Sequence, residues 1–335
     1  EGKIKVWNLE LGTKELEFSA GYAVSSICYN NDGTLLASGG SNPLVHIWSA
    51  ETGDSVKSLV AHKTGSNVVL FNPDGTKLAS GGNDNKIYIW DLNRADSLTT
   101  LSGHNGAIYC LDFSKDSTIL VSGSADRTIK IWDLKTGKQK KSQFANGVVN
   151  SLKITPNGTK IVNVSSDQKL NVWEIETMVK LGSYTEENYY SVDISPDSLA
   201  AVSGGRNNIS IKSLSNGADS AVFSVGHRGT IGFLEMSNDN KTIASAGSDT
   251  TIKIWNAETK KVIRSIFTNY IVLSFGIDKK AQYVVALLRK SFSEYNLNIW
   301  ETATGKLVRS IRDSGAFWNT IAVNPDGTLI ACGYK

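Results

Sequence analysis

Cysteine and net charge are both scarce in this chain, and each shortage narrows what the protein can be. The 335 residues include three cysteines, Cys28, Cys110 and Cys332, an odd number without the spacing of a metal site. We therefore expect buried free thiols and no disulfide framework, which favours a reducing, intracellular compartment, cytoplasmic or nuclear. No apolar run approaches the length of a membrane span, and the first residues lack the apolar centre of a signal peptide.

The low net charge argues against a nucleic-acid partner. A net charge of +3 arises from 35 basic and 32 acidic residues that are scattered along the chain. A nucleic-acid surface needs a concentrated basic face, so we expect neither nucleic acid nor a membrane as a partner. Only 20% of the residues are charged and 40% are apolar, which is ample material for a core. No like-charge block predicts a disordered tail, so the chain is expected to be folded throughout.

What the chain does contain is one motif, repeated. The segment VSGSADRTIKIWDL at residues 121–134 returns in recognisable form, and Lys212 takes the place of its tryptophan in one copy. The tryptophans at this place are Trp7, Trp48, Trp90, Trp132, Trp173, Trp255 and Trp300. Successive positions lie 39 to 45 residues apart. A period of about 40 to 45 residues with strand patterning is typical of four-stranded propeller blades.

Each repeat predicts four short strands, which we call a to d in chain order. The residues one and three positions before each tryptophan position are aliphatic, and those between them are mostly polar, which is the period of two of a strand. Turns rich in Asn, Asp, Gly and Pro separate the strands and predict tight hairpins. For the repeat of Trp132 the predicted strands span residues 107–113, 117–123, 127–133 and 138–144.

The two ends of the chain are halves of one repeat. Residues 3–9 match a strand c, and the last residues stop where other repeats continue into theirs. Joined end to end, the stretch from Ala331 to Trp7 contains 12 residues, as does the stretch from Ala79 to Trp90. We therefore predict one all-β domain over residues 1–335, a single closed propeller of eight four-stranded antiparallel blades. Blade eight is shared between residues 1–20 and 315–335, with N-terminal strands c and d pairing with C-terminal strands a and b.

Three of the four histidines occupy the same place in their repeats. Each precedes its tryptophan by 28 residues, and the same repeats carry Asp six and Ser ten residues before that tryptophan. A buried indole N–H needs an acceptor, a hydroxyl can accept from it and donate to an imidazole, and the imidazole can donate to a carboxylate. The predicted sets are His62, Ser80, Asp84 and Trp90; His104, Ser122, Asp126 and Trp132; and His227, Ser245, Asp249 and Trp255.

These residues resemble the tryptophan-aspartate (WD) repeat family over essentially the whole chain; GHNGAIYCLDFS with SGSADRTIKIWDL is a close match. The resemblance implies that the Asp-His-Ser-Trp network is structural, tying the loop after strand d to strands b and c. It applies to the three sets above alone. Blade one has Asn42 at the Asp position, blade four has Asp167 without a histidine, and blade five has Arg206 and Lys212.

A catalytic interpretation of the same residues is less economical. Ser122, His104 and Asp126 could act as nucleophile, base and orienter of a hydrolase. An enzyme needs one such site in one cleft, whereas this trio occurs three times, each time with a tryptophan that accounts for it. We therefore predict no catalytic residue, no metal and no cofactor. The fourth histidine, His46, alternates with aliphatic neighbours and is interpreted as an ordinary strand residue.

The resemblance implies an interaction platform whose partners favour the face formed by the d–a and b–c loops. Three regions break the repeat there: aromatic residues near the start of strand a in blades seven, eight and one, a lengthened b–c loop in blade seven, and the divergent blade five. The candidate partner-binding residues are Tyr22, Tyr270, Phe317, Trp318 and Tyr334; Arg289, Lys290 and Phe292; and Tyr189, Tyr190 and Arg206. Packing of Tyr22 and Trp318 between blades, and repeat decay in blade five, are the alternatives.

We predict a non-enzymatic, monomeric scaffold that binds a protein or peptide, alone or within a larger complex. The alternative is a receptor for phosphorylated or acidic peptides, gripped bidentately by arginines of the same face, namely Arg127, Arg206, Arg228 and Arg289. A propeller enzyme is the third possibility, and it would require a deep channel lined by isolated carboxylates or metal ligands.

Overall fold

The computed structural model consists of short strands joined by turns. It describes residues 2–60, 62–94, 98–185, 191–205, 207–214, 219–223, 226–278, 280–291, 294–314 and 317–334. Within this part of the chain no helix is long and apolar enough to cross a membrane. The chain divides into two compact units, one of residues 1–149 with 317–335 and one of residues 150–316. Each unit holds four sheets.

The first unit contains blades eight, one, two and three. Blade eight consists of β31 (Trp318–Val323), β32 (Leu329–Tyr334), β1 (Lys3–Asn8) and β2 (Lys14–Ser19). Blade one consists of β3 (Val24–Tyr29), β4 (Leu35–Gly40), β5 (Leu44–Ser49) and β6 (Ser55–Val60). Blade two consists of β7 (Ser66–Phe71), β8 (Lys77–Gly82), β9 (Lys86–Asp91) and β10 (Leu98–Ser102). Blade three consists of β11 (Ile108–Phe113), β12 (Ile119–Ser124), β13 (Thr128–Asp133) and β14 (Lys138–Phe144).

The second unit contains blades four to seven. Blade four consists of β15 (Val149–Ile154), β16 (Lys160–Ser165), β17 (Lys169–Glu174) and β18 (Lys180–Thr185). Blade five consists of β19 (Ser191–Ile194), β20 (Ala200–Gly204), β21 (Ile209–Ser213) and β22 (Asp219–Phe223). Blade six consists of β23 (Ile231–Met236), β24 (Thr242–Gly247), β25 (Thr251–Asn256) and β26 (Lys261–Phe267). Blade seven consists of β27 (Ile271–Ile277), β28 (Tyr283–Arg289), β29 (Glu294–Glu301) and β30 (Leu307–Ser314).

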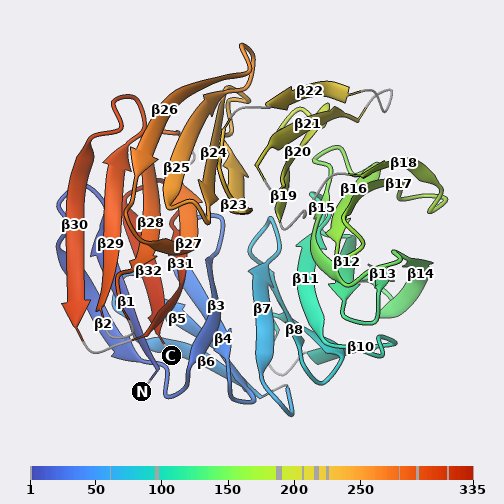
Figure 1. Ribbon diagram of the computed structural model, residues 1–335. Coiled ribbons are helices and arrows are strands. Elements are labelled where there is room, and N and C mark those ends of the chain that lie inside the picture. Colours follow the sequence, from blue (N-terminus) through green and yellow to red (C-terminus); the bar gives the residue numbers. More distant parts are fainter. Residues whose placement is uncertain are drawn as a thin grey trace. The chain divides into compact units, whose positions relative to one another are not determined.

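The predicted eight-bladed, all-β propeller is confirmed. Eight four-stranded antiparallel sheets are present, and one of them joins the two ends of the chain in the order β2-β1-β32-β31 (Figure 1). In that sheet Ile4 lies opposite Gly333 and Trp7 opposite Ile330. The four strands predicted for blade three agree with β11 to β14 to within two residues at each end. A single domain over residues 1–335 stays a prediction.

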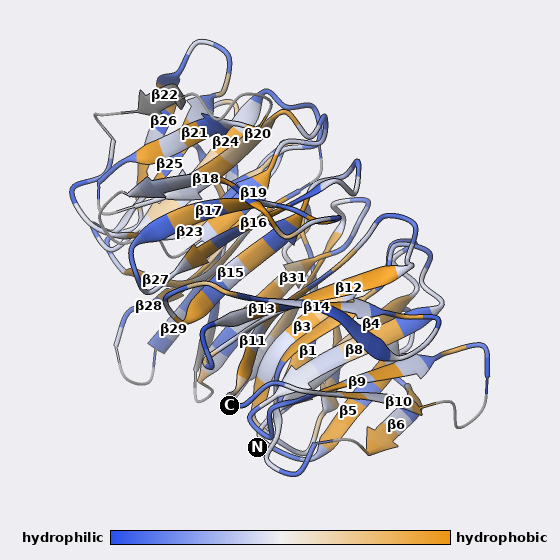
Figure 2. Cartoon of the chain, turned by 90° about the vertical axis from the view of Figure 1, so that its right-hand side faces the viewer, coloured by the Kyte–Doolittle hydropathy of each residue, from blue (hydrophilic) through white to orange (hydrophobic). Residues whose placement is uncertain are grey.

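Strands b and c are largely buried, and within each unit neighbouring blades pack on one another. In blade one, Val45 and Ile47 of β5 pack on Phe71 of blade two, whereas Trp48 packs on Ile4 of blade eight. The outer strand d is exposed by comparison, as in β14, where five of seven residues are exposed and two are half-buried. Figure 2 shows this contrast, since β12 carries the hydrophobic colour and β14 the hydrophilic colour.

In blades one, three, four and six the polar residue two positions before the tryptophan bonds to a serine of strand d. Lys130 Nζ donates to Ser142 Oγ at 3.0 Å, and Lys253 Nζ donates to Ser265 Oγ at 2.8 Å. In blade one this residue is His46, whose Nδ1 lies 2.9 Å from Ser58 Oγ. His46 also stacks on the tryptophan of its blade, with 4.9 Å between ring centroids, so it does more than fill a strand position. The signal for these pairs is a hydroxyl ten residues after the tryptophan.

The three cysteines are free and form no disulfide with one another. Cys332 is buried, as predicted, whereas the side chains of Cys28 and Cys110 are only half-buried. Burial raises the pKa of the Cys28 thiol to about 12, so this thiol stays protonated and unreactive near neutral pH.

Candidate functional site

The network of blade three joins four elements of one blade. His104 precedes β11, Ser122 lies on β12, Asp126 follows β12, and Trp132 lies on β13. The indole Nε1 of Trp132 donates to Ser122 Oγ at 2.8 Å, and that Oγ lies 2.7 Å from His104 Nε2. His104 Nδ1 lies 2.7 Å from Asp126 Oδ2. The indole only donates and the carboxylate only accepts, whereas the hydroxyl and the neutral imidazole between them each donate one hydrogen bond and accept another inside the blade.

Blade six repeats this arrangement, and blade two repeats its contacts of histidine with aspartate and serine. In blade six the His227 ring lies 2.9 Å from Asp249 and 2.8 Å from Ser245, whose Oγ accepts from Trp255 Nε1 at 2.9 Å. In blade two the His62 ring lies 2.9 Å from Asp84 Oδ1 and 2.7 Å from Ser80 Oγ. The ring of Tyr88 meets His62 edge-on at 4.7 Å and stacks on Trp90 at 6.2 Å.

The electrostatics of the networks in blades two and three favour a neutral imidazole. Burial lowers the pKa of His62 and of His104, against the opposing attraction of the neighbouring carboxylates. We therefore assign the single ring proton to Nδ1, facing the carboxylate, which leaves Nε2 to accept from the serine. Burial alone would raise the pKa of Asp126, but the donations from a hydroxyl, a backbone N–H and His104 together lower it.

The networks are closed to substrates. The histidine side chains are 0% exposed in blades two and six and 1% exposed in blade three. Ser80, Ser122 and Ser245 are fully buried. A nucleophile must reach the substrate, and a buried hydroxyl already engaged by an imidazole, and in blades three and six also by an indole, cannot do so. Among the described residues, no group of three or more His, Cys, Asp or Glu side chains could hold a metal ion.

The predicted aromatic binding surface does not form. Tyr22 is 5% exposed, Trp318 is 2% exposed and Tyr334 is 1% exposed, so these three side chains are part of the core. Trp318 stacks on Trp7 at 6.4 Å and lies 5.0 Å from the ring of Tyr334. Tyr22 packs in the core cluster between blades eight and one, as in the alternative of packing between blades. The ring partners of Trp318 lie within its own blade. Phe317 is 54% exposed and remains a surface residue.

Other candidates stand apart or cannot be placed. Tyr189, Tyr190, Arg206 and Phe292 lie outside the described residues. Tyr270 is half-buried and packs against the core cluster between blades six and seven. Of the four arginines considered for acidic peptides, Arg127 belongs to the first unit, whereas Arg228 and Arg289 belong to blades six and seven of the second. No contact brings any two of these three together among the residues that the structure describes.

Two exposed apolar residues flank the d–a loop that leads into blade seven. Phe267 ends β26 with 73% of its side chain exposed, and Ile271 begins β27 with 47% exposed. Arg289 lies directly opposite Ile271 in the pairing of β27 with β28, and the exposed Lys290 follows it. The Lys290 ammonium lies 3.1 Å from a carboxylate oxygen of Glu294. We call Phe267, Ile271, Arg289 and Lys290 the blade-seven surface; it combines a d–a loop with a b–c loop.

Comparison with known proteins agrees with this architecture. A family model described as the IFT122 first beta-propeller matches residues 66–335, which is most of the chain. The chain belongs to the WD-repeat β-propeller family. A second model, described as the Anaphase-promoting complex subunit 4 WD40 domain, matches residues 3–70.

Two curated relatives are similar over part of the WD-repeat region. The chain is 33% identical to mouse (Mus musculus) WD repeat-containing protein 3 and 32% identical to human (Homo sapiens) WD repeat-containing protein 3, each over 102 residues. Those residues are 30% of this chain and 10% of each relative. The similarity therefore covers a small fraction of the relatives' length.

The WD-repeat network persists in altered form in blades that lack its histidine. In blade one the hydroxyl of Tyr22 lies 3.1 Å from Ser38 Oγ, which accepts from Trp48 Nε1 at 2.9 Å. In blade four Trp173 Nε1 donates to Asn163 Oδ1 at 2.7 Å. Sequence reasoning missed both substitutions, because Tyr22 precedes its tryptophan by 26 residues and not 28 and Asn163 is an amide in a hydroxyl's place.

Proposed function

We propose that this WD-repeat chain is a non-enzymatic scaffold that binds a partner protein or peptide through its d–a and b–c loops. The blade-seven surface is the observation that carries the proposal. Phe267 is 73% exposed, and contact between an apolar ring and water is unfavourable. A partner that covers the ring would remove it from water. Binding hot spots are enriched in aromatic residues and arginine. In blade seven, Arg289 of β28 lies opposite Ile271 of β27.

The three buried Ser-His-Asp networks support the absence of catalysis. Each is engaged inside its own blade, and the repetition of one arrangement in three blades suits a structural role rather than a single active site. One of the matching family models is named for a subunit of a complex, which favours action within a larger assembly. The three free cysteines favour a reducing, intracellular compartment.

A partner-capture experiment tests the blade-seven surface. Phe267→Ser combined with Arg289→Glu removes its apolar and cationic parts, and both changes lie at exposed or half-buried positions. We expect the variant to fold and to lose at least about tenfold in the recovery of specific partners, as for loss of a hot spot. Recovery is measured by quantitative mass spectrometry of proteins captured from the source cell.

The matched control is Leu11→Ser, because Leu11 is 61% exposed in the c–d turn of blade eight and outside the proposed face. If the control loses the same partners as the double variant, the blade-seven surface is not what binds them. Retention of all partners by both variants would also count against this surface.

A further inference from the structure

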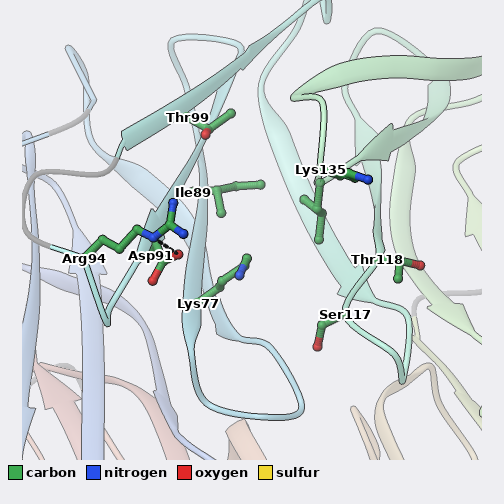
Figure 3. A pocket seen from close by; sticks show the side chains of 9 residues that line it. Lys77, Ile89, Asp91, Arg94, Thr99, Ser117, Thr118 and Lys135 are labelled. Atoms are coloured by element: carbon green, nitrogen blue, oxygen red, sulfur yellow. Dashed lines mark ion pairs between the residues drawn. The ribbon is translucent and has the colours of Figure 1, made fainter.

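A pocket of about 380 Å³ lies between blades two and three, on the side of the a–b and c–d turns (Figure 3). Its volume falls within the usual range of ligand sites, about 300 to 1,000 Å³. Lys77, Asp91 and Arg94 line it from blade two, and Ser117 and Lys135 line it from blade three. Both blades belong to the first unit.

The pocket carries a surplus of positive charge. Its lining contains three cations, Lys77, Arg94 and Lys135, against one carboxylate, Asp91. Arg94 Nε lies 4.0 Å from Asp91 Oδ2 and its side chain is 79% exposed, so this pair is loose. Among the residues that the structure describes, no carboxylate lies within ion-pair distance of Lys77 or Lys135.

The neighbouring carboxylates are already engaged in their own turns. Asp116 accepts from Ser114 Oγ at 2.6 Å and from the Thr118 hydroxyl at 2.9 Å. Asp133 accepts from the backbone N–H groups of Lys135 and Thr136 at 3.0 and 2.8 Å. These carboxylates keep their negative charge, but none forms an ion pair with Lys77 or Lys135 among the described residues; Lys77 does act electrostatically on Asp74 and helps to lower its pKa.

The two walls of the pocket differ. The hydroxyl of Ser117 has no hydrogen-bond partner among the described residues, but it is buried, so a molecule in the pocket does not reach it in this conformation. Figure 3 shows Lys77 reaching into the gap from one wall and Ser117 standing on the other. Between them, Ile89 and Leu134 provide apolar surface.

We propose that this pocket binds an oxyanion, a carboxylate or a phosphate, that is carried by a peptide of a partner protein. Lys77 contacts the oxyanion and the exposed Lys135 side chain closes on it, while an aliphatic neighbour in the peptide packs on Ile89 and Leu134. This proposal rests on the proposed scaffold function, for which it names the chemical group of the partner that is bound. Its site is in the first unit and shares no residue with the blade-seven surface.

Fluorescence anisotropy with matched peptides tests the pocket. The probes are labelled pentapeptides in which glutamate, phosphoserine or glutamine stands between two leucines flanked by glycines, added to the full 335-residue chain. We expect saturable binding of the glutamate peptide, the phosphoserine peptide or both, and at least about tenfold weaker binding of the glutamine peptide. Lys77→Gln and Lys135→Glu should each weaken the charged peptides by about tenfold.

The matched control is Lys115→Gln, which removes one positive charge from the a–b turn of blade three at a residue that does not line the pocket. Equal losses with Lys115→Gln and Lys77→Gln, equal affinity for the glutamine peptide, or no saturable binding of either charged peptide would overturn the proposal. Competition by inorganic phosphate as strong as by the phosphoserine peptide would overturn the peptide assignment. The Phe267→Ser, Arg289→Glu variant should bind the peptides normally, which separates this proposal from the partner-capture test.

Discussion

At the scale of single residues, two tryptophans at the same place in the repeat differ by one hydrogen bond. Trp132 Nε1 donates to Ser122, whereas the buried Nε1 of Trp7 has no partner among the described residues. The register explains the difference, because Cys332 lies opposite Lys5 where Ser122 lies opposite Lys130. A thiol is a weak acceptor, so the indole of blade eight lacks the hydroxyl that its counterpart uses.

We expect Trp132→Phe to lower the free energy of unfolding by about 1 to 3 kcal/mol, because it removes the indole donor from the buried Ser122 hydroxyl. Trp7→Phe makes the same change in packing without breaking an indole hydrogen bond, so its loss should be smaller. Urea unfolding followed by circular dichroism measures both. Equal losses for the two variants would show that packing, and not the hydrogen bond, sets the effect.

The same residues show what sequence alone could predict. His104, Ser122 and Asp126 were predictable because three blades carry His, Ser and Asp at fixed distances before the tryptophan. The donors and acceptors of these side chains suggest one order of hydrogen bonds, from indole to hydroxyl to imidazole to carboxylate. Tyr22 was not, because its hydroxyl reaches Ser38 from a different offset and with a different side chain. The burial of Trp318 was also hidden, since it depends on which side chains of neighbouring strands cover it. Exposure of loop residues is decided by tertiary packing, which has no period in the sequence.

At the scale of the elements, carboxylates connect the strands a of neighbouring blades. Asp193 Oδ2 of β19 accepts from the backbone N–H of Met236 in β23 at 2.9 Å. Glu235 Oε2 of β23 in turn accepts from the N–H of Ile277 in β27 at 3.0 Å. Burial, with repulsion from Asp193, raises the pKa of Glu235 from 4.5 to about 7, although the Ile277 N–H and Lys153 oppose the shift.

This raised pKa makes the contact between blades six and seven sensitive to pH. The folded chain holds the Glu235 proton more tightly than the unfolded chain, so the stability contributed by this group falls as pH rises from about 4.5 to about 7. Glu235→Gln keeps an acceptor without the charge. We expect it to be more stable than the parent by about 1 to 3 kcal/mol at pH 8 and equally stable at pH 4.5. Urea unfolding across this range checks the difference, and a gap that does not change with pH would contradict it.

At the scale of the whole molecule, blade eight joins the two ends of the chain. Between Gly333 and Ile4, which lie opposite each other, direct linkage of residues 335 and 1 would leave a five-residue connection. Gly81 and Ile87 are also opposite partners, and five residues connect them in blade two. The number of blades was predictable because the sequence motif occurs once per blade. The division into two compact units has no counterpart in the distances between successive motifs.

We therefore expect a circular permutant to fold. The permutant links residues 335 and 1 directly and opens the chain between Glu258 and Thr259, in the exposed c–d turn of blade six. Because the new connection matches a natural b–c loop in length, the melting temperature should stay within about 5 °C of the parent. Calorimetry provides the measurement. A second permutant with two residues removed from the new connection is the control, and it should melt lower because Ile4 and Gly333 could then no longer pair.

The pairing of β1 with β32 also sets how the molecule responds to tension. Ile4 lies opposite Gly333 and Asn8 opposite Leu329, so residues 3 and 334 lie at the same end of the β1–β32 pair. Force applied between them would load the cross-strand hydrogen bonds one after another, as in a zipper, because those bonds run perpendicular to the strands. A pull from opposite ends of the pair would instead shear all of them at once. The pairing of β1 with β32 therefore yields more easily when residues 3 and 334 are drawn apart than when it is sheared.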